Sequence, residues 1–85
     1  MNEMNNISIH FFGIQRLVTK TDSIHMPITE KTRAGDVLEY LRRKYPALSL
    51  DEQMVLITVN HVVVSRDTPL RPNDHVCFVP GIGGG

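Results

Sequence analysis

The first regular hydrophobic pattern in the chain covers residues 7–13. Ile7, Ile9 and Phe11 form one set of alternate positions, and the other set is Ser8, His10 and Phe12. A two-residue period in β-branched and aromatic residues is typical of a strand with one buried face. The pattern therefore predicts a strand whose core-facing side carries Ile7 and whose opposite side carries Phe12.

Four more short segments have the composition and the period of strands; they are residues 24–29, 54–59, 62–64 and 75–79. Pro27 cannot donate a hydrogen bond to a neighbouring strand, so the strand that contains it is predicted to lie at a sheet edge. Asn60 and His61 occupy the position of a two-residue hairpin turn between the next two strands.

Residues 32–45 are the segment with helical periodicity. Its apolar stripe consists of Val37, Leu38, Leu41 and Tyr45. Thr32 is predicted to be the N-cap, although Gly35 weakens the assignment of the first turn. Pro46 is predicted to end the helix, because the residue before a proline is forced out of helical geometry.

The predicted order is strand, strand, helix, strand, short strand and strand, with a polar connection between the first two strands. This order indicates an α+β fold in which a mixed sheet of four to five strands packs on one main helix. The second face of the sheet is expected to be at least partly open. The 85 residues suffice for one domain, which we assign to residues 1–80, with residues 81–85 as a flexible tail.

The composition argues against several classes of function. Nine basic and nine acidic residues balance, and no basic stripe is present, so nucleic acid is not an expected partner. Cys77 is the sole cysteine, which indicates a reducing, cytoplasmic location without a disulfide. Residues 1–6 do not resemble a signal peptide, and the apolar run at residues 62–64 is too short to cross a membrane.

The end of the sequence has a composition of its own: Gly81, Ile82, Gly83, Gly84 and Gly85. Glycine loses more conformational freedom on ordering than other residues, so this tail is expected to be mobile in the free protein. It is also narrow enough to enter a channel in a partner and present the Gly85 carboxylate there. That carboxylate is ionised at neutral pH. Adenylation with ATP in an enzyme that supplies Mg²⁺ would activate it for attack by sulfur. A frayed terminus without a role is the alternative.

Motifs in the last third of the chain accompany this tail. They are, in order, Val59-Asn60-His61, Asp67-Thr68-Pro69-Leu70, Asn73-Asp74-His75-Val76 and residues 78–85. The series resembles the MoaD/ThiS family of ubiquitin-like sulfur carriers, and within it the small subunit of molybdopterin synthase more than the thiazole carrier. Residues 7–13 and 36–46 are similar to the first strand and the helix of the family. His61 and Asn73 stand where the family usually has glycine.

The resemblance implies a ubiquitin-like β-grasp fold and a carrier, not an enzyme. It implies that a ubiquitin-activating-type adenylyltransferase uses ATP with Mg²⁺ to adenylate Gly85, and that a persulfide donor supplies the sulfur of a thiocarboxylate. The large subunit of a synthase would accept this sulfur, most readily in molybdopterin synthesis. No cofactor is expected to bind stably. The alternatives are a carrier for thiazole or another sulfur metabolite, a ubiquitin-like protein modifier, and a β-grasp interaction module.

Side chains elsewhere give weaker signals. His10, His25, His61 and His75 lack the local spacing that brings imidazoles to one metal ion, so no metal site is predicted. Cys77 is interpreted as a packed strand thiol, and no catalytic residue is predicted.

A docking face is the remaining candidate site. The alternation in the strands places Phe12, Leu56, Cys77 and Val79 on the side of the sheet away from the helix. An apolar patch there would bind the activating enzyme or the acceptor. A loop that covers the same patch is the alternative.

Overall fold

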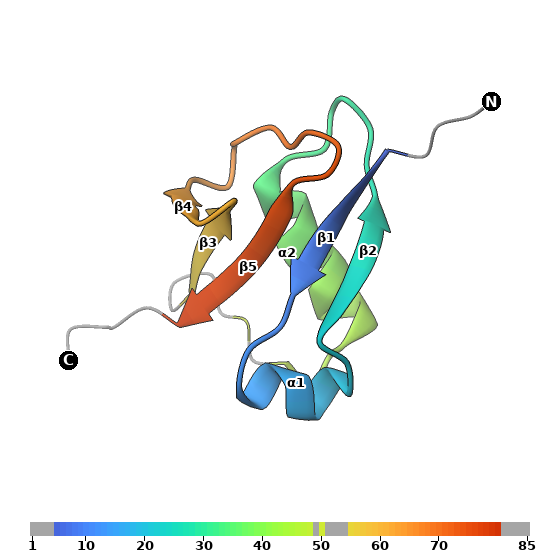
Figure 1. Ribbon diagram of the computed structural model, residues 1–85, viewed down its shortest axis with the longest axis vertical. Coiled ribbons are helices and arrows are strands. Elements are labelled where there is room, and N and C mark those ends of the chain that lie inside the picture. The colour runs from blue at the N-terminus through green and yellow to red at the C-terminus, as the bar shows by residue number, and fades with distance from the viewer. Residues whose placement is uncertain (1–4, 49, 51–54, 81–85) are drawn as a thin grey trace.

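A five-stranded mixed sheet with one long helix behind it forms the fold (Figure 1). The computed structural model describes residues 5–48, 50 and 55–80. The elements are β1 (Asn6–His10), α1 (Ile14–Thr19), β2 (Ser23–Pro27), α2 (Ala34–Lys44), β3 (Val55–Val59), β4 (Val62–Val64) and β5 (His75–Pro80). The expected α+β architecture and the mixed sheet are confirmed.

The sheet has the order β2-β1-β5-β3-β4. The first and last strands of the chain, β1 and β5, are parallel neighbours at its centre, and the other pairs are antiparallel. β2 is an edge strand, as Pro27 predicts, because a missing donor is tolerated on the side without a neighbour. The hairpin turn at Asn60 and His61 is also confirmed, with φ angles of 52° and 72°.

The core lies between the sheet and α2. The helix contributes Val37, Leu38 and Leu41, each completely buried, and the central strands contribute Val76 and Phe78. Burial of one such side chain stabilises the fold by about 1.5–3 kcal/mol. The other face of the sheet points toward the viewer in Figure 1, and neither helix covers it.

The start of α2 differs from the prediction. Thr32 is not its N-cap, because its hydroxyl accepts a hydrogen bond from the Thr29 amide (2.9 Å) and so stabilises the preceding turn. The first helical amides, those of Ala34 and Gly35, donate instead to the carbonyls of Thr68 and Arg66, at 2.9 Å each. A distant backbone segment therefore replaces the side-chain cap.

The expected polar connection between the first two strands is wrong, since it contains α1. The pattern concealed this helix because two of its three hydrophobic residues face outward: Ile14 and Leu17 are 73% and 74% exposed, and Val18 alone packs against the core. The buried side chains of this six-residue helix are those of Gln15 and Thr19. In the described part of the chain, no helix has the length and hydropathy required to cross a membrane.

Candidate functional site

The strand that leads to the predicted tail is held at the centre of the sheet. β5 pairs with β1 from His75 to Cys77 and with β3 from Val76 to Pro80. Val76 and Phe78 fix it to the core, being 0% and 1% exposed. The predicted tail residues, Gly81, Ile82, Gly83, Gly84 and Gly85, lie outside the described residues. The tail therefore follows a strand whose position is set by pairing on both sides.

One buried polar side chain, Gln15, connects β5 to α1. Its amide nitrogen donates to the Phe78 carbonyl at 2.9 Å, and its carbonyl oxygen accepts from the Phe12 amide at 3.1 Å. The pairing of β1 with β5 ends at Cys77, one residue before Phe78. Gln15 thus continues the hydrogen bonding of β5 beyond the end of β1.

The predicted docking residues lie as the alternation requires, but with unequal exposure. Phe12 is 54% exposed, Leu56 45% and Val79 36%, whereas Cys77 is 8% exposed. Leu56 and Val79 are direct partners in the pairing of β3 with β5. Cys77 therefore contributes little accessible area, and the accessible apolar groups on this side are Phe12, the Leu56–Val79 pair and Val63 of β4, which lies opposite Thr58.

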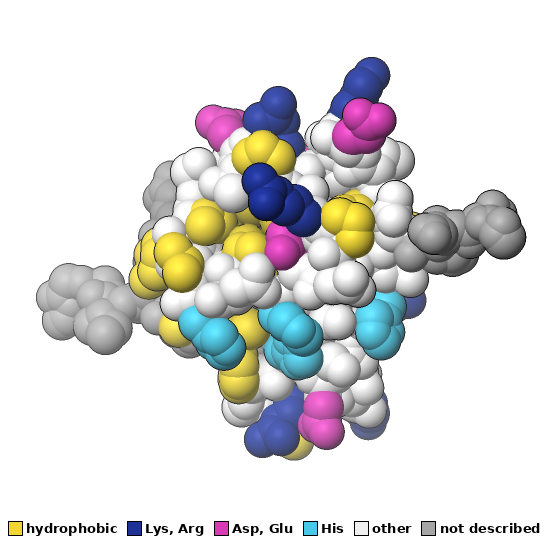
Figure 2. Space-filling view, turned by 45° about the horizontal axis from the view of Figure 1, so that its top comes forward, with side chains coloured by type: hydrophobic (Ala, Val, Ile, Leu, Met, Phe, Trp, Pro, Cys, Tyr) yellow, Lys and Arg dark blue, Asp and Glu magenta, His cyan; other side chains and the backbone are white. Residues whose placement is uncertain are grey.

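A hollow of about 470 Å³ opens on the same face. It is lined by His10, Phe11, Phe12, Arg16, Asp22, His61, His75 and Cys77. Histidine side chains, in cyan, form a row across the face that Figure 2 presents, with hydrophobic side chains beside them. Arg16 and Asp22 form an exposed ion pair at 3.5 Å beside the hollow.

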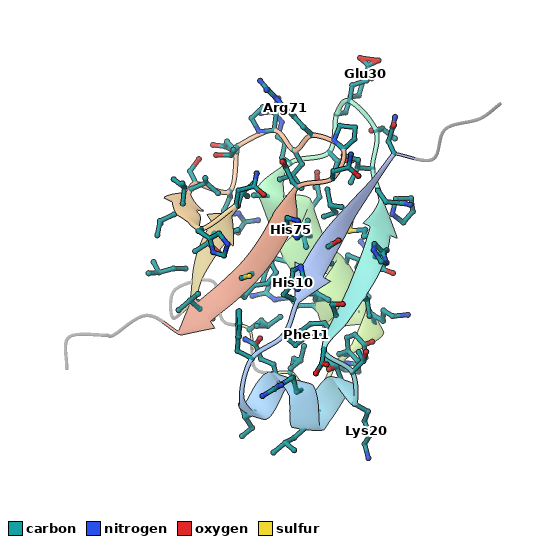
Figure 3. The ribbon with its side chains drawn as sticks, in the orientation of Figure 1. His10, Phe11, Lys20, Glu30, Arg71 and His75 are labelled. Carbon is teal, nitrogen blue, oxygen red and sulfur yellow. The ribbon has the colours of Figure 1, made fainter. Side chains whose placement is uncertain are left out.

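Two of the histidines contact each other, which the sequence pattern did not predict. Nε2 of His10 lies 2.9 Å from Nδ1 of His75. Figure 3 shows the two side chains on the neighbouring strands β1 and β5. They are 65 residues apart, so local spacing gives no sign of the contact. In the alternation of their strands, both residues fall on the side of the sheet away from α2. A parallel alignment of the first and last strands would therefore have brought the two histidines together.

The sheet order, with the first and last strands parallel at the centre and one long helix on one face, defines a ubiquitin-like β-grasp protein. The putative molybdopterin converting factor, subunit 1, from Pyrococcus furiosus has the same fold, with a TM-score of 0.78. It is 24% identical, and the alignment covers 91% of this chain and 98% of that one.

Sequence comparison defines the family. The ThiS family profile matches residues 9–85. The molybdopterin synthase sulfur carrier subunit of Mycobacterium tuberculosis is 28% identical over 83 residues, which cover 96% of this chain and 100% of the relative. The protein of the same name from Escherichia coli is 33% identical over 85 residues, which cover 93% of this chain and 99% of the relative. The chain belongs to the ThiS family, a family of small sulfur carriers that act as co-substrates and not as catalysts.

Proposed function

We propose that this protein carries sulfur as a thiocarboxylate on Gly85 and supplies it to molybdopterin synthesis in the cytoplasm. The observation that carries the proposal is the family match, which extends through the glycine-rich residues 81–85 to Gly85. The relatives from Mycobacterium tuberculosis and Escherichia coli are both named as sulfur carrier subunits of molybdopterin synthase, and both match over nearly their full length.

The proposed chemistry takes place on the Gly85 carboxylate. An adenylyltransferase of the ubiquitin-activating type binds the tail, and the carboxylate attacks the α-phosphorus of ATP and releases pyrophosphate. Mg²⁺ in that partner neutralises the phosphate charge. The outer sulfur of a persulfide then attacks the adenylated carbonyl and displaces AMP, which leaves an acyl disulfide. A thiol cleaves the S–S bond of this intermediate and is oxidised to a disulfide with the donor, so that the carrier is released with sulfur in place of one terminal carboxylate oxygen. ATP and Mg²⁺ are used by the partner in this scheme and are not bound stably by the carrier.

The described fold supports such a role through the position of β5. A glycine-rich tail needs a fixed origin if a partner is to bind the domain and the tail together. The pairing of β5 with two strands and the hydrogen bond from Gln15 to Phe78 provide this origin. The exposed side chains of Phe12, Leu56 and Val79 offer an apolar surface on the open face, where the activating enzyme and the large synthase subunit would dock.

Reconstitution tests the proposal. The protein is incubated with its activating enzyme, ATP, Mg²⁺, a persulfide donor and a thiol reductant, and intact-mass spectrometry follows the replacement of one oxygen by sulfur. Deletion of Gly84 and Gly85 should abolish the mass change, whereas deletion of residues 1–3 should preserve it. A wild-type chain that remains unmodified, while an established carrier reacts with the same enzyme and donor, would overturn the proposal.

A further inference from the structure

The contact between His10 and His75 is built into the centre of the sheet. In the parallel pairing of β1 with β5, Ser8 lies opposite His75 and His10 lies opposite Cys77. The two rings therefore rise from adjacent strands, with their centroids 5.0 Å apart and their planes inclined by 38°. Figure 3 shows them at the middle of the open face.

The backbone beneath His75 is held from the neighbouring turn. Its amide donates to Oδ1 of Asn60 at 2.9 Å, and its carbonyl accepts from the Asn60 amide at 2.8 Å. Asn60 in turn donates from its side chain to Asp74 at 3.0 Å. This network fixes the backbone position of His75, and the pairing of β1 with β5 fixes that of His10.

We propose that His10 and His75 form a two-imidazole site for a transition-metal cation on the open face of the sheet. A histidine nitrogen binds Zn²⁺ at about 2.0–2.1 Å. Two such nitrogens that subtend an angle between a right angle and a tetrahedral angle at the ion are separated by about 2.9–3.4 Å. The observed separation between Nε2 of His10 and Nδ1 of His75 is 2.9 Å. The two ligand atoms are thus already at the required separation. Binding requires each ring to turn by about 35–45°, so that its lone pair leaves the line between the two nitrogens and points to the shared ion.

A change of tautomer allows both rings to bind the cation while each imidazole stays neutral. In the hydrogen-bonded pair, one of the two facing nitrogens carries a proton and the other accepts it. When a cation binds, that proton moves to the outward nitrogen of its own ring. His10 then binds through Nε2 with its proton on Nδ1, and His75 binds through Nδ1 with its proton on Nε2. Both imidazoles remain neutral, which is the form that coordinates metals.

The ligands select the class of cation. Imidazole nitrogen suits Zn²⁺, Cu²⁺ and Ni²⁺, whereas Mg²⁺ and Ca²⁺ prefer oxygen. Among the residues that the structure describes, no set of three His, Cys, Asp or Glu side chains is placed to share an ion. Water therefore completes the coordination, and the hollow on the open face gives it access. Asp22 and Arg16 also line the hollow, and their charges largely offset each other because they are paired.

Amide NMR spectra with Cu²⁺ locate the site, because a bound paramagnetic ion broadens nearby signals. Broadening is expected first in residues 8–10 and 74–77, and Mg²⁺ at the same concentration should leave these signals unchanged. Titration calorimetry with Zn²⁺ then measures affinity. His10→Ala and His75→Ala should each raise Kd at least about tenfold, since loss of an outer-shell partner alone costs about 10- to 100-fold.

His25→Ala is the matched control. His25 lies opposite Ser8 on β2, so it is on the same face, but it is separated from His75 by the whole of β1. This variant should bind Zn²⁺ as the wild type does. His10→Gln and His75→Gln, checked for native spectra, replace either alanine variant that does not fold. Broadening confined to other segments, or an equal loss of affinity in His25→Ala, would overturn the proposal. The site does not depend on Gly85, so its test is separate from that of the sulfur-carrier function.

Discussion

The side-chain amide of Gln15 donates a 2.9 Å hydrogen bond to the backbone carbonyl of Phe78. This contact joins a short helix near the N-terminus to the central strand that precedes the glycine tail. The same side chain accepts a hydrogen bond from the amide of Phe12. Gln15 of α1 is therefore bonded both to the segment that follows β1 and to β5. Residues 63 positions apart thereby determine the geometry of one end of the sheet.

Gln15→Ala should lower the free energy of unfolding by about 1–3 kcal/mol, because it leaves the buried Phe78 carbonyl without its donor. Urea denaturation followed by circular dichroism measures the change. Arg16→Ala, on the same helix, removes an exposed ion pair and should cost less than about 0.5 kcal/mol. Equal stability of the two variants would show that the Gln15 contact does not stabilise β5.

Glycine at the two left-handed turn positions should stabilise the protein. His61 and Asn73 have φ angles of 72° and 71°, a region that is unfavourable for most residues with a Cβ atom. His61→Gly is expected to raise the free energy of unfolding by about 0.5–1 kcal/mol. Asn73→Gly should give a smaller gain, since asparagine tolerates this conformation.

Lys31→Gly provides the comparison for these two variants. Lys31 is exposed and lies in a turn without a positive φ. Glycine there adds freedom only to the unfolded chain and should lower stability slightly. Thermal denaturation of the three variants therefore separates the effect of the turn geometry from the general effect of glycine. A loss of stability in His61→Gly would contradict the turn assignment.

Phe12→Lys should weaken binding to the large synthase subunit by at least about tenfold, which corresponds to the loss of about 1.4 kcal/mol from one interface contact. Phe12 is exposed, so the substitution should leave the melting temperature nearly unchanged. Leu17→Lys changes an even more exposed apolar residue on α1 and should not affect binding. Calorimetric affinities that are the same for wild type and Phe12→Lys would place the interface elsewhere.

The strands and the long helix could be predicted because their buried faces follow regular periods. Val76 and Phe78 alternate with Cys77 and Val79, and the structure buries the first pair in the core. The hairpin at Asn60 and His61 was equally predictable from turn chemistry. His61 adopts a left-handed conformation, and glycine is the more common residue at such a turn position.

The features that escaped prediction depend on contacts between distant segments. The first amides of α2 are satisfied by carbonyls of Arg66 and Thr68, and Asp36 accepts from the Arg33 amide, so no N-cap side chain of the usual kind marks the helix start. α1 buries a glutamine in place of a hydrophobic stripe, and a pattern of apolar spacing does not detect it. The pairing of His10 with His75 follows from the parallel adjacency of the first and last strands, which hydrophobic periodicity within each strand does not specify.

Intact-mass analysis of the protein isolated from its native cells tests the central claim most directly. The account predicts a fraction of chains that end at Gly85 and in which one terminal oxygen is replaced by sulfur; this fraction should disappear in cells that lack the activating enzyme. Chains that extend beyond Gly85 without being trimmed, or chains found exclusively in an isopeptide bond to lysine, would contradict it. The second result would identify a protein modifier and not a sulfur carrier.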